Sequence, residues 1–237
     1  MQNLLSILGV IAALWRFWTS LAGIVLLLIA LNHYLPPQHN PSKPLNLNDE
    51  VGVATFGKLR HIRRNSEACF AVLERSGFDY LRLEDEETGE GCGFQNALSF
   101  DALTLFYDRP LRISCGMATS LAIWESMAVR PLAEELFDQP ITEIMTYGTY
   151  SCRNIAGSRR RSEHAQANAI DIVGFRLANG ETITVKDNWS DGTAKGEFLT
   201  KLHRRGCRIF NVVLGPDYNA AHADHFHLDN GLRHSCK

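Results

Sequence analysis

The first 35 residues are the part of the chain that most restricts its fold. Residues 4–31 form an apolar run that contains a single charge, Arg16. The stretch 17–35 is long enough to cross a bilayer, which requires about 20 apolar residues, and aromatic side chains at both of its ends suit the membrane interfaces. The sequence therefore predicts one transmembrane segment within residues 1–35, with the following domain on the outer side of the membrane.

A cleaved signal peptide is the competing interpretation of the same run. Signal peptides have a shorter apolar region that ends in a small-x-small cleavage site, and the residues NHYLPPQ after Leu31 offer no such site. No cysteine follows the run closely, so a lipoprotein anchor is not favoured either. We therefore expect an uncleaved signal anchor, in which residues 4–15 either extend the span or lie along the membrane.

Composition divides the rest of the chain into a linker, residues 36–50, and one exported domain, residues 51–237. The linker is rich in proline and asparagine and has no periodicity, which is typical of a semi-extended spacer. The folded part is expected to begin between about Val51 and Ser66. With 24 basic and 26 acidic residues, the chain lacks the basic surplus of nucleic-acid-binding proteins, so we expect no nucleic-acid partner.

Six cysteines follow the apolar run, and none of them is spaced as C-x-x-C. An even number of cysteines in an exported domain indicates disulfide bonds rather than a zinc ribbon or a redox site. Six cysteines allow 15 pairings, and the simplest scheme joins neighbours in sequence. That scheme predicts the pairs Cys69–Cys92, Cys115–Cys152 and Cys207–Cys236.

Hydrophobic periodicity in the domain predicts a mixture of helices and strands. Asn179-Gly180 lies between two apolar runs and is a hairpin signal. Helical spacing covers 66–76, 116–138 with a break or kink near Pro131, and 196–206 with Gly206 as C-cap. Alternation covers 78–84, 141–150, 169–175, 208–215 and 226–228. This order predicts an α+β domain with a small antiparallel sheet and flanking helices.

The segment HADHFHLD, residues 222–229, concentrates side chains that bind metals. If it is extended, His225, His227 and Asp229 share one face while the two apolar residues between them share the other. The segment SEHAQANAIDI places His164 seven residues before Asp171, which also alternates with apolar neighbours. A histidine, an aspartate and one distal histidine would form the three-ligand, open arrangement of a catalytic zinc site.

The two segments SEHAQANAIDIVGF and HADHFHLD together resemble the extensin-like C-terminal domain family of bacterial proteins. That family is similar to a wider group of zinc peptidases, which includes D-Ala-D-Ala carboxypeptidases, penicillin-insensitive murein endopeptidases and hedgehog-type domains. GTYSCR, FNVVLGPDYN and the cysteine positions extend the resemblance over roughly Cys69 to Cys236. The resemblance implies a domain on the periplasmic side of a bacterial inner membrane, with peptidoglycan peptides as its substrate.

The resemblance also implies a role for each residue of the site. It makes His164, Asp171 and His227 the zinc ligands, His225 the catalytic histidine, and Arg153 a residue that faces the scissile carbonyl or a substrate carboxylate. His222 matches a further active-site histidine of some murein endopeptidases and is expected to face the substrate. Independently of the resemblance, Asp224 and Asp229 are carboxylates that either orient a ligand imidazole or are turn residues and solvated charges. For Arg159, Arg160 and Arg161 a solvated loop is favoured over contact with substrate.

One position departs from the family pattern, because Ala167 stands where a glycine is usual. If the backbone there needs a positive φ, alanine costs about 1 kcal/mol or more. The resulting hypothesis is a membrane-anchored zinc peptidase that hydrolyses amide bonds in peptidoglycan. A regulatory protein partner that controls this activity is compatible with the sequence. The alternatives are a zinc-containing module that binds peptidoglycan without hydrolysing it, and a disulfide-stabilised structural wall protein.

Overall fold

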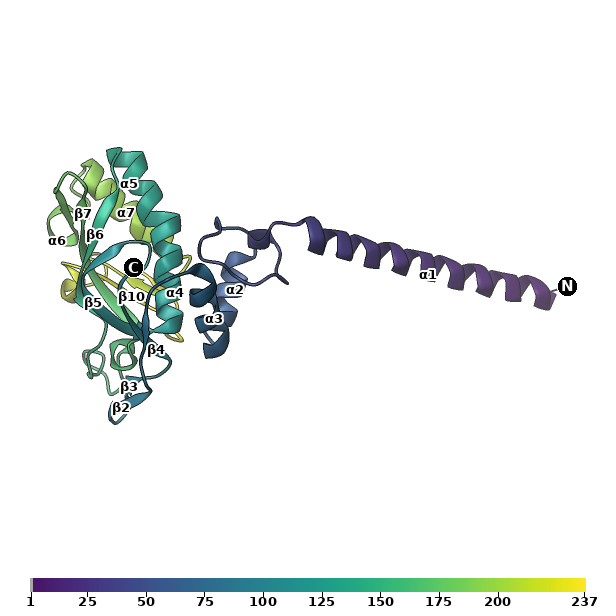
Figure 1. Ribbon diagram of the computed structural model, residues 1–237, viewed down its shortest axis with the longest axis horizontal. Helices are drawn as coiled ribbons and strands as arrows, with labels where there is room; N and C mark the ends of the chain where they lie inside the picture. The colour runs from purple at the N-terminus through teal and green to yellow at the C-terminus, as the bar shows by residue number, and fades with distance from the viewer. Residues whose placement is uncertain (1) are drawn as a thin grey trace.

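The computed structural model describes residues 2–237, with side-chain burial from residue 8 onward. Helix α1, Gln2–Tyr34, projects away from the remainder of the chain (Figure 1). From Leu8 onward most of its apolar side chains are exposed, and Leu8–Tyr34 is long and apolar enough to cross a membrane. This helix is compatible with a membrane anchor or with a signal sequence.

Within residues 2–237, nine strands form one mixed sheet in the order β1-β4-β5-β6-β7-β10-β9-β11, with β8 paired to β7. The strands are β1 Leu81–Arg82, β4 Ala97–Ala102, β5 Phe106–Ser114, β6 Ile141–Gly148, β7 Ala169–Leu177, β8 Thr182–Thr184, β9 Val212–Leu214, β10 Phe226–Asp229 and β11 Ser235–Cys236; β2 Glu86–Gly89 and β3 Cys92–Phe94 form a separate hairpin.

The expected small antiparallel sheet is therefore wrong in size and in strand direction. The pairs β5–β6 and β9–β11 are parallel. The short edge strand β11 gave no sequence signal. The expected strand over 78–84 shrinks to β1, and the one over 208–215 shrinks to β9.

Helices pack against the apolar face of this sheet and against each other. They are α2 Thr55–Ile62, α3 Ser66–Ser76, α4 Cys115–Trp124, α5 Arg130–Phe137, α6 Val185–Asn188 and α7 Ala194–Gly206, with short turns η1 Pro37–His39, η2 Glu125–Val129, η3 Glu163–Gln166 and η4 Ala220–His222. Trp124 of α4 and Phe198 of α7 both meet Phe175 of β7, at ring-centroid distances of 6.0 and 5.2 Å.

Local signals explain the helix ends. Asn65 accepts a hydrogen bond from the Ala68 N–H and caps α3, and Gly77 ends that helix in the left-handed region at φ 73°. Of the break or kink expected near Pro131, the break is absent, because the π-helical turn η2 joins α4 to α5 without interruption. Gly206 is the last residue of α7 rather than its C-cap, which is Cys207.

Residues 36–50, which we predicted to be a spacer, lie against the domain instead. Leu45 and Leu47 are buried in the main core. The Leu47 N–H donates to Ser76 Oγ at 3.0 Å, and Arg75 donates to the Leu45 carbonyl at 3.2 Å. The segment PLNLND contains a short apolar alternation that we overlooked because its surroundings are rich in proline and asparagine. Its two leucines, Leu45 and Leu47, pack on α3.

Three disulfides close the domain, and two of them differ from the sequential scheme. Cys69 of α3 pairs with Cys115 at the start of α4, because these two helices pack together, and Cys92 of β3 pairs with Cys152 after β6. The predicted Cys69–Cys92 and Cys115–Cys152 pairs are therefore wrong, since the β2–β3 hairpin folds away from α3 and over η3. The predicted Cys207–Cys236 pair is confirmed.

Peptide mapping under non-reducing conditions should recover Cys69–Cys115 and Cys92–Cys152, with Cys207–Cys236 as the internal control. Replacing Cys92 and Cys152 together by serine should lower the free energy of unfolding by about 2–4 kcal/mol, because the bridge closes a long loop. Denaturant titration of the variant measures this loss. Recovery of a Cys69–Cys92 peptide would contradict the packing of the hairpin described above.

Candidate metal centre

Two of the candidate ligands face each other across neighbouring strands. In the antiparallel pairing of β7 with β10, Asp171 lies directly opposite His227. The apolar neighbours of both residues, among them Ile172 and Phe226, point into the main core. Asp171 and His227 therefore project from the opposite face, and His227 Nδ1 lies 3.0 Å from Asp171 Oδ1.

The η3 turn brings in the third candidate, His164. Ser162 caps this turn, and the buried His164 ring points at the strand pair, with Nε2 lying 3.1 Å from Asp171 Oδ1 and 3.1 Å from His227 Nδ1. Ala167 ends the turn in the left-handed region at φ 51°. The positive φ anticipated at this position is present, and the chain tolerates alanine there while the ligand geometry is kept.

Both imidazoles are oriented by acceptors on their far sides. His164 Nδ1 lies 3.0 Å from the Thr149 carbonyl, and His227 Nε2 lies 3.0 Å from Asp229 Oδ2. A carbonyl and a carboxylate only accept, so these two nitrogens carry the ring protons. The inner nitrogens, His164 Nε2 and His227 Nδ1, then direct their lone pairs at each other and at the Asp171 carboxylate.

Without a proton, these three donor atoms within 3.1 Å of one another would repel, so the cluster needs either a proton or a metal cation among them. Around a tetrahedral zinc ion with ligand bonds of about 2.0–2.2 Å, donor atoms are about 3.3–3.5 Å apart, so this set needs to open by only a few tenths of an ångström. Two imidazole nitrogens and one carboxylate oxygen are also a donor set that zinc accepts. The residues His164, Asp171 and His227 therefore fit a zinc ion.

The close contacts among these residues also shift the pKa values of His227 and Asp171. Burial alone would lower the pKa of His227, but hydrogen bonds to Asp171 and Asp229 raise it to about 9. Burial would raise the pKa of Asp171, yet hydrogen bonds from His164 and His227 hold it well below its ordinary value. The centre thus attracts positive charge. A metal ion that binds there must displace the proton on His227, so the affinity of the centre for the metal rises with pH.

Two further histidines form the wall beside the centre. His225 Nδ1 lies 2.8 Å from Asp224 Oδ1, and His225 Nε2 is turned toward Asp171 Oδ1 at 3.6 Å. His222 stacks near His225 with ring centroids 5.3 Å apart. Burial lowers the pKa of His222 to about 4, together with the charges of His227 and His225.

Tyr147 is a member of this wall that the sequence did not single out. Its hydroxyl donates to Asp224 Oδ2 at 3.0 Å, and its ring meets the His225 ring edge-on at 5.6 Å. The Thr149 carbonyl was missed as well. Every residue has a backbone carbonyl, so the sequence does not single out the one of Thr149. Tyr147 lies in a strand that ends some 75 residues before Asp224, and only folding brings these two side chains together.

The centre opens into a cleft of about 540 Å3. All the predicted site residues except His164 and Asp224 line it, and Arg153 acts electrostatically on His222. Asp224 supports His225 from behind, and Asp229 supports His227. Arg160 and Arg161 reach the cleft too, but Arg161 is held by two hydrogen bonds to the Glu90 carbonyl and one to Asn154.

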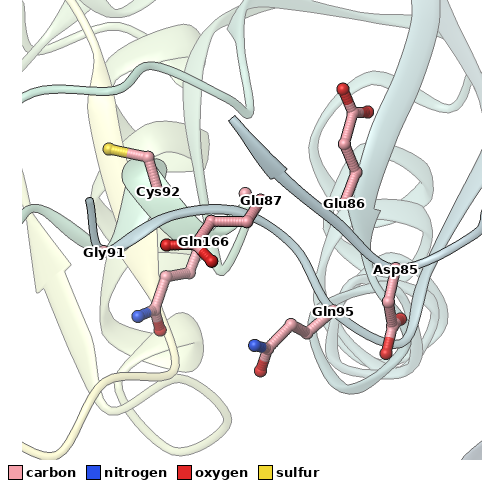
Figure 2. A pocket seen from close by; sticks show the side chains of 8 residues that line it. Asp85, Glu86, Glu87, Gly91, Cys92, Gln95 and Gln166 are labelled. Atoms are coloured by element: carbon pink, nitrogen blue, oxygen red, sulfur yellow. The ribbon is translucent and has the colours of Figure 1, made fainter. Parts of the chain in front are cut away.

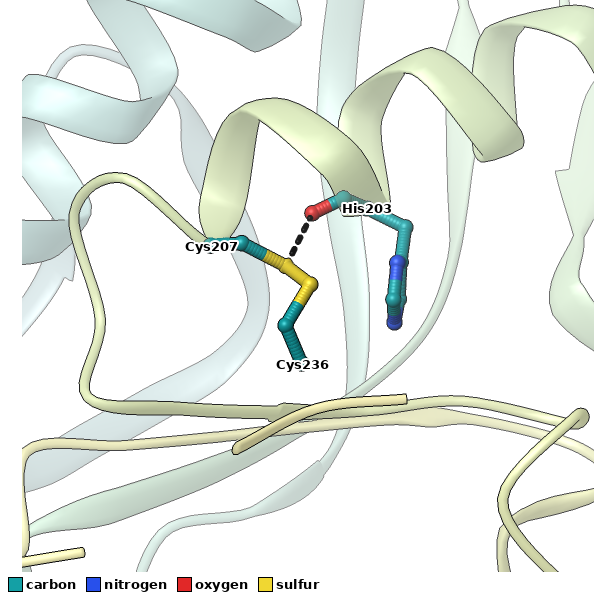
Figure 3. Close-up of side chains that lie close together, drawn as sticks. All are labelled: His203, Cys207 and Cys236. Atoms are coloured by element: carbon teal, nitrogen blue, oxygen red, sulfur yellow. Dashed lines mark hydrogen bonds between the residues drawn. A yellow bond between two sulfur atoms is a disulfide. The ribbon is translucent and has the colours of Figure 1, made fainter. Parts of the chain in front are cut away.

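Two other clusters do not make a comparable centre. His203, Cys207 and Cys236 lie close together (Figure 3), but both sulfurs are bonded to each other in the disulfide. The acidic segment around β2 lines a shallow groove of about 370 Å3. Figure 2 shows Asp85 and Glu86 pointing in different directions, so these carboxylates do not converge on one ion.

Asp229→Ala should weaken zinc binding by about 10–100-fold, because His227 then loses the partner that fixes its tautomer and ring orientation. Competition against a chromogenic chelator measures the affinity. Asp101→Ala, which removes an exposed aspartate of β4, is the matched control and should bind zinc as the wild type does. An unchanged affinity in a folded Asp229→Ala protein would refute the role given to Asp229.

Comparison with known proteins agrees with this description at the level of family. No curated protein and no solved structure matches the chain. The family model described as Extensin-like protein C-terminus matches residues 67–237, which is well over half of the chain and contains the whole candidate centre. The chain therefore belongs to the extensin-like C-terminal family.

Proposed function

We propose that this protein is a zinc-dependent peptidase that hydrolyses amide bonds in the peptides of peptidoglycan. The observation that carries the proposal is the convergence of three oriented lone-pair donors, His164, Asp171 and His227, beside His225 in an open cleft. Three protein ligands leave a position for water or substrate, which is the pattern of catalytic rather than structural zinc. When bound, zinc would polarise the scissile carbonyl and acidify a water molecule.

His225 is the residue placed to move protons in this cleft. Its Nδ1 is engaged by Asp224, whose carboxylate only accepts, so Nδ1 carries the ring proton and Nε2 presents a lone pair toward the centre. Nε2 takes a proton from the attacking water and passes it to the leaving amine nitrogen, so hydrolysis yields one carboxylate and one amine. Tyr147 holds Asp224, and through it the His225 ring, in this orientation.

Charge around the cleft supports an anionic peptide as substrate. Arg153, Arg160 and Arg233 all line it, and Arg153 is exposed. A guanidinium pairs well with a carboxylate in two parallel hydrogen bonds, and peptidoglycan peptides carry carboxylates. Arg153 also lies close enough to lower the pKa of His222 slightly, and this proximity supports a role for Arg153 in pairing with a developing oxyanion or a terminal carboxylate.

The N-terminal helix supports a location at a membrane. In this proposal α1 is an uncleaved, single-pass anchor in the bacterial inner membrane, and the domain with its three disulfides lies in the periplasm. Disulfides persist in that oxidising compartment, and the cell wall lies within reach of a domain anchored there.

Incubation of the full-length protein with purified muropeptides should release products that mass spectrometry identifies as cleavage of one amide bond. A chelator should abolish the cleavage and added zinc should restore it, because His164, Asp171 and His227 have no catalytic role without the ion. The mass of the product names the bond. Intact muropeptides with a protein that holds one zinc per chain would favour the non-hydrolytic binding module instead.

His225→Ala and His227→Ala should separate catalysis from metal binding. His225→Ala should lower kcat by about 10²–10⁴-fold while zinc content stays near one per chain, since only proton transfer is lost. His227→Ala should lose both zinc and activity. Arg204→Ala, which removes an exposed arginine of α7 that does not line the cleft, is the control. Full activity in a zinc-loaded His225→Ala protein would rule out His225 as the proton carrier.

A further inference from the structure

A second concave surface lies where α1 joins the domain. It is a groove of about 680 Å3 between residues 41–45, α2 and α3. None of its lining residues belongs to the cleft of the metal centre. Its floor is apolar and its edge is basic. The floor residues are Leu45, Ala54, Ile62, Ala68, Ala71 and Val72, and the basic residues are Lys43, Lys58, His61 and Arg75.

The groove has a fixed position relative to the end of α1. Asn40 donates from its side-chain amide to both the carbonyl and the side-chain oxygen of Asn32, at 3.1 and 3.0 Å. Lys43 donates to the Leu35 carbonyl at 3.0 Å, and Lys58 donates to the Pro37 carbonyl at 2.6 Å. Figure 1 shows α2 and α3 at the side of the domain from which α1 emerges. If α1 crosses a bilayer up to Tyr34, the groove therefore lies at the level of the lipid headgroups.

The basic residues of the groove lack carboxylate partners. Among the described side chains, none of the four forms an ion pair. Burial lowers the pKa of Lys58, Asp49 raises it, and the charge of Lys43 lowers it again. Lys43 and Lys58 thus bring two like charges close together beside an apolar floor, and Asp49 offsets this repulsion without forming an ion pair with either. An amphiphile with an anionic head would relieve the repulsion and cover the floor at once.

We propose that this groove binds one anionic phospholipid of the surrounding membrane. The phosphate group would contact Lys43 and Lys58, with His61 and Arg75 at the edge, and the first carbons of one acyl chain would lie on the floor formed by α2 and α3. A concave, mostly apolar site with a few oriented polar groups is the usual form of a small-molecule site. The inference rests on the membrane anchor proposed above and is independent of peptidase activity.

Native mass spectrometry of the full-length protein released from mild detergent tests this proposal. With phosphatidylglycerol and phosphatidylcholine supplied in equal amounts, the wild type should retain one phosphatidylglycerol in preference to phosphatidylcholine. Replacing both lysines, Lys43→Gln with Lys58→Gln, should weaken retention on the order of twentyfold, because each basic residue near a lipid surface contributes about fivefold. Lys186→Gln with Arg204→Gln removes the same charge at exposed positions elsewhere and should change nothing.

A second variant tests the floor without touching charge. Ala71→Phe fills the groove and should abolish retention while the thermal unfolding of the domain stays close to that of the wild type. Equal retention of both lipids, or undiminished retention in both groove variants, would overturn the proposal. Stronger retention of a polyprenyl phosphate than of phosphatidylglycerol would overturn the assignment to a membrane phospholipid. If the full-length protein stays in solution without detergent, α1 is not a membrane anchor. That result would overturn the lipid site and would leave the proposed peptidase activity on muropeptides untouched.

Discussion

The register between β7 and β10 is the constraint on which the candidate centre depends. It places Asp171 opposite His227 and Ile172 opposite Phe226. The apolar pairs fix this register, because a slip by one residue would carry Phe226 and Leu228 out of the core and the two polar residues into it. The hydrophobic effect therefore enforces the contact between Asp171 and His227. A strand pair is also a rigid base, which keeps the donor atoms in place for a metal ion.

The third donor comes from a turn, and turns need separate support. The η3 turn is held by the Ser162 cap, by the Ser114 N–H bonded to the Ala167 carbonyl at 2.8 Å, and by the contact of His164 with Thr149. The Cys92–Cys152 bridge ties the hairpin β2–β3 to the strand end that supplies Thr149. The disulfide thus stabilises the position of His164 as well as the domain. Strain at Ala167, about 1 kcal/mol, is small beside these restraints.

The sequence predicted the centre better than it predicted the fold. Alternation and helical spacing are local, so the strand faces of Asp171 and His227 and helix α3 could be predicted. The seven-residue spacing to Asp171 suggested His164, and the family resemblance agreed with it. Pairings between distant segments depend on packing, which no local pattern encodes. The Cys69–Cys115 bridge follows from the contact of α3 with α4, and the burial of Leu45 and Leu47 follows from a surface of α3 that the sequence does not reveal. Tyr147 meets Asp224 for the same reason.

The central claim is that His164, Asp171 and His227 bind one zinc ion through nitrogen and oxygen alone. X-ray absorption at the zinc edge of the purified, zinc-loaded protein tests it most directly. The account predicts about four light-atom ligands at about 2.0–2.2 Å, with the multiple-scattering pattern of two imidazoles. A sulfur ligand at about 2.3 Å, or a six-coordinate shell without imidazole, would contradict it.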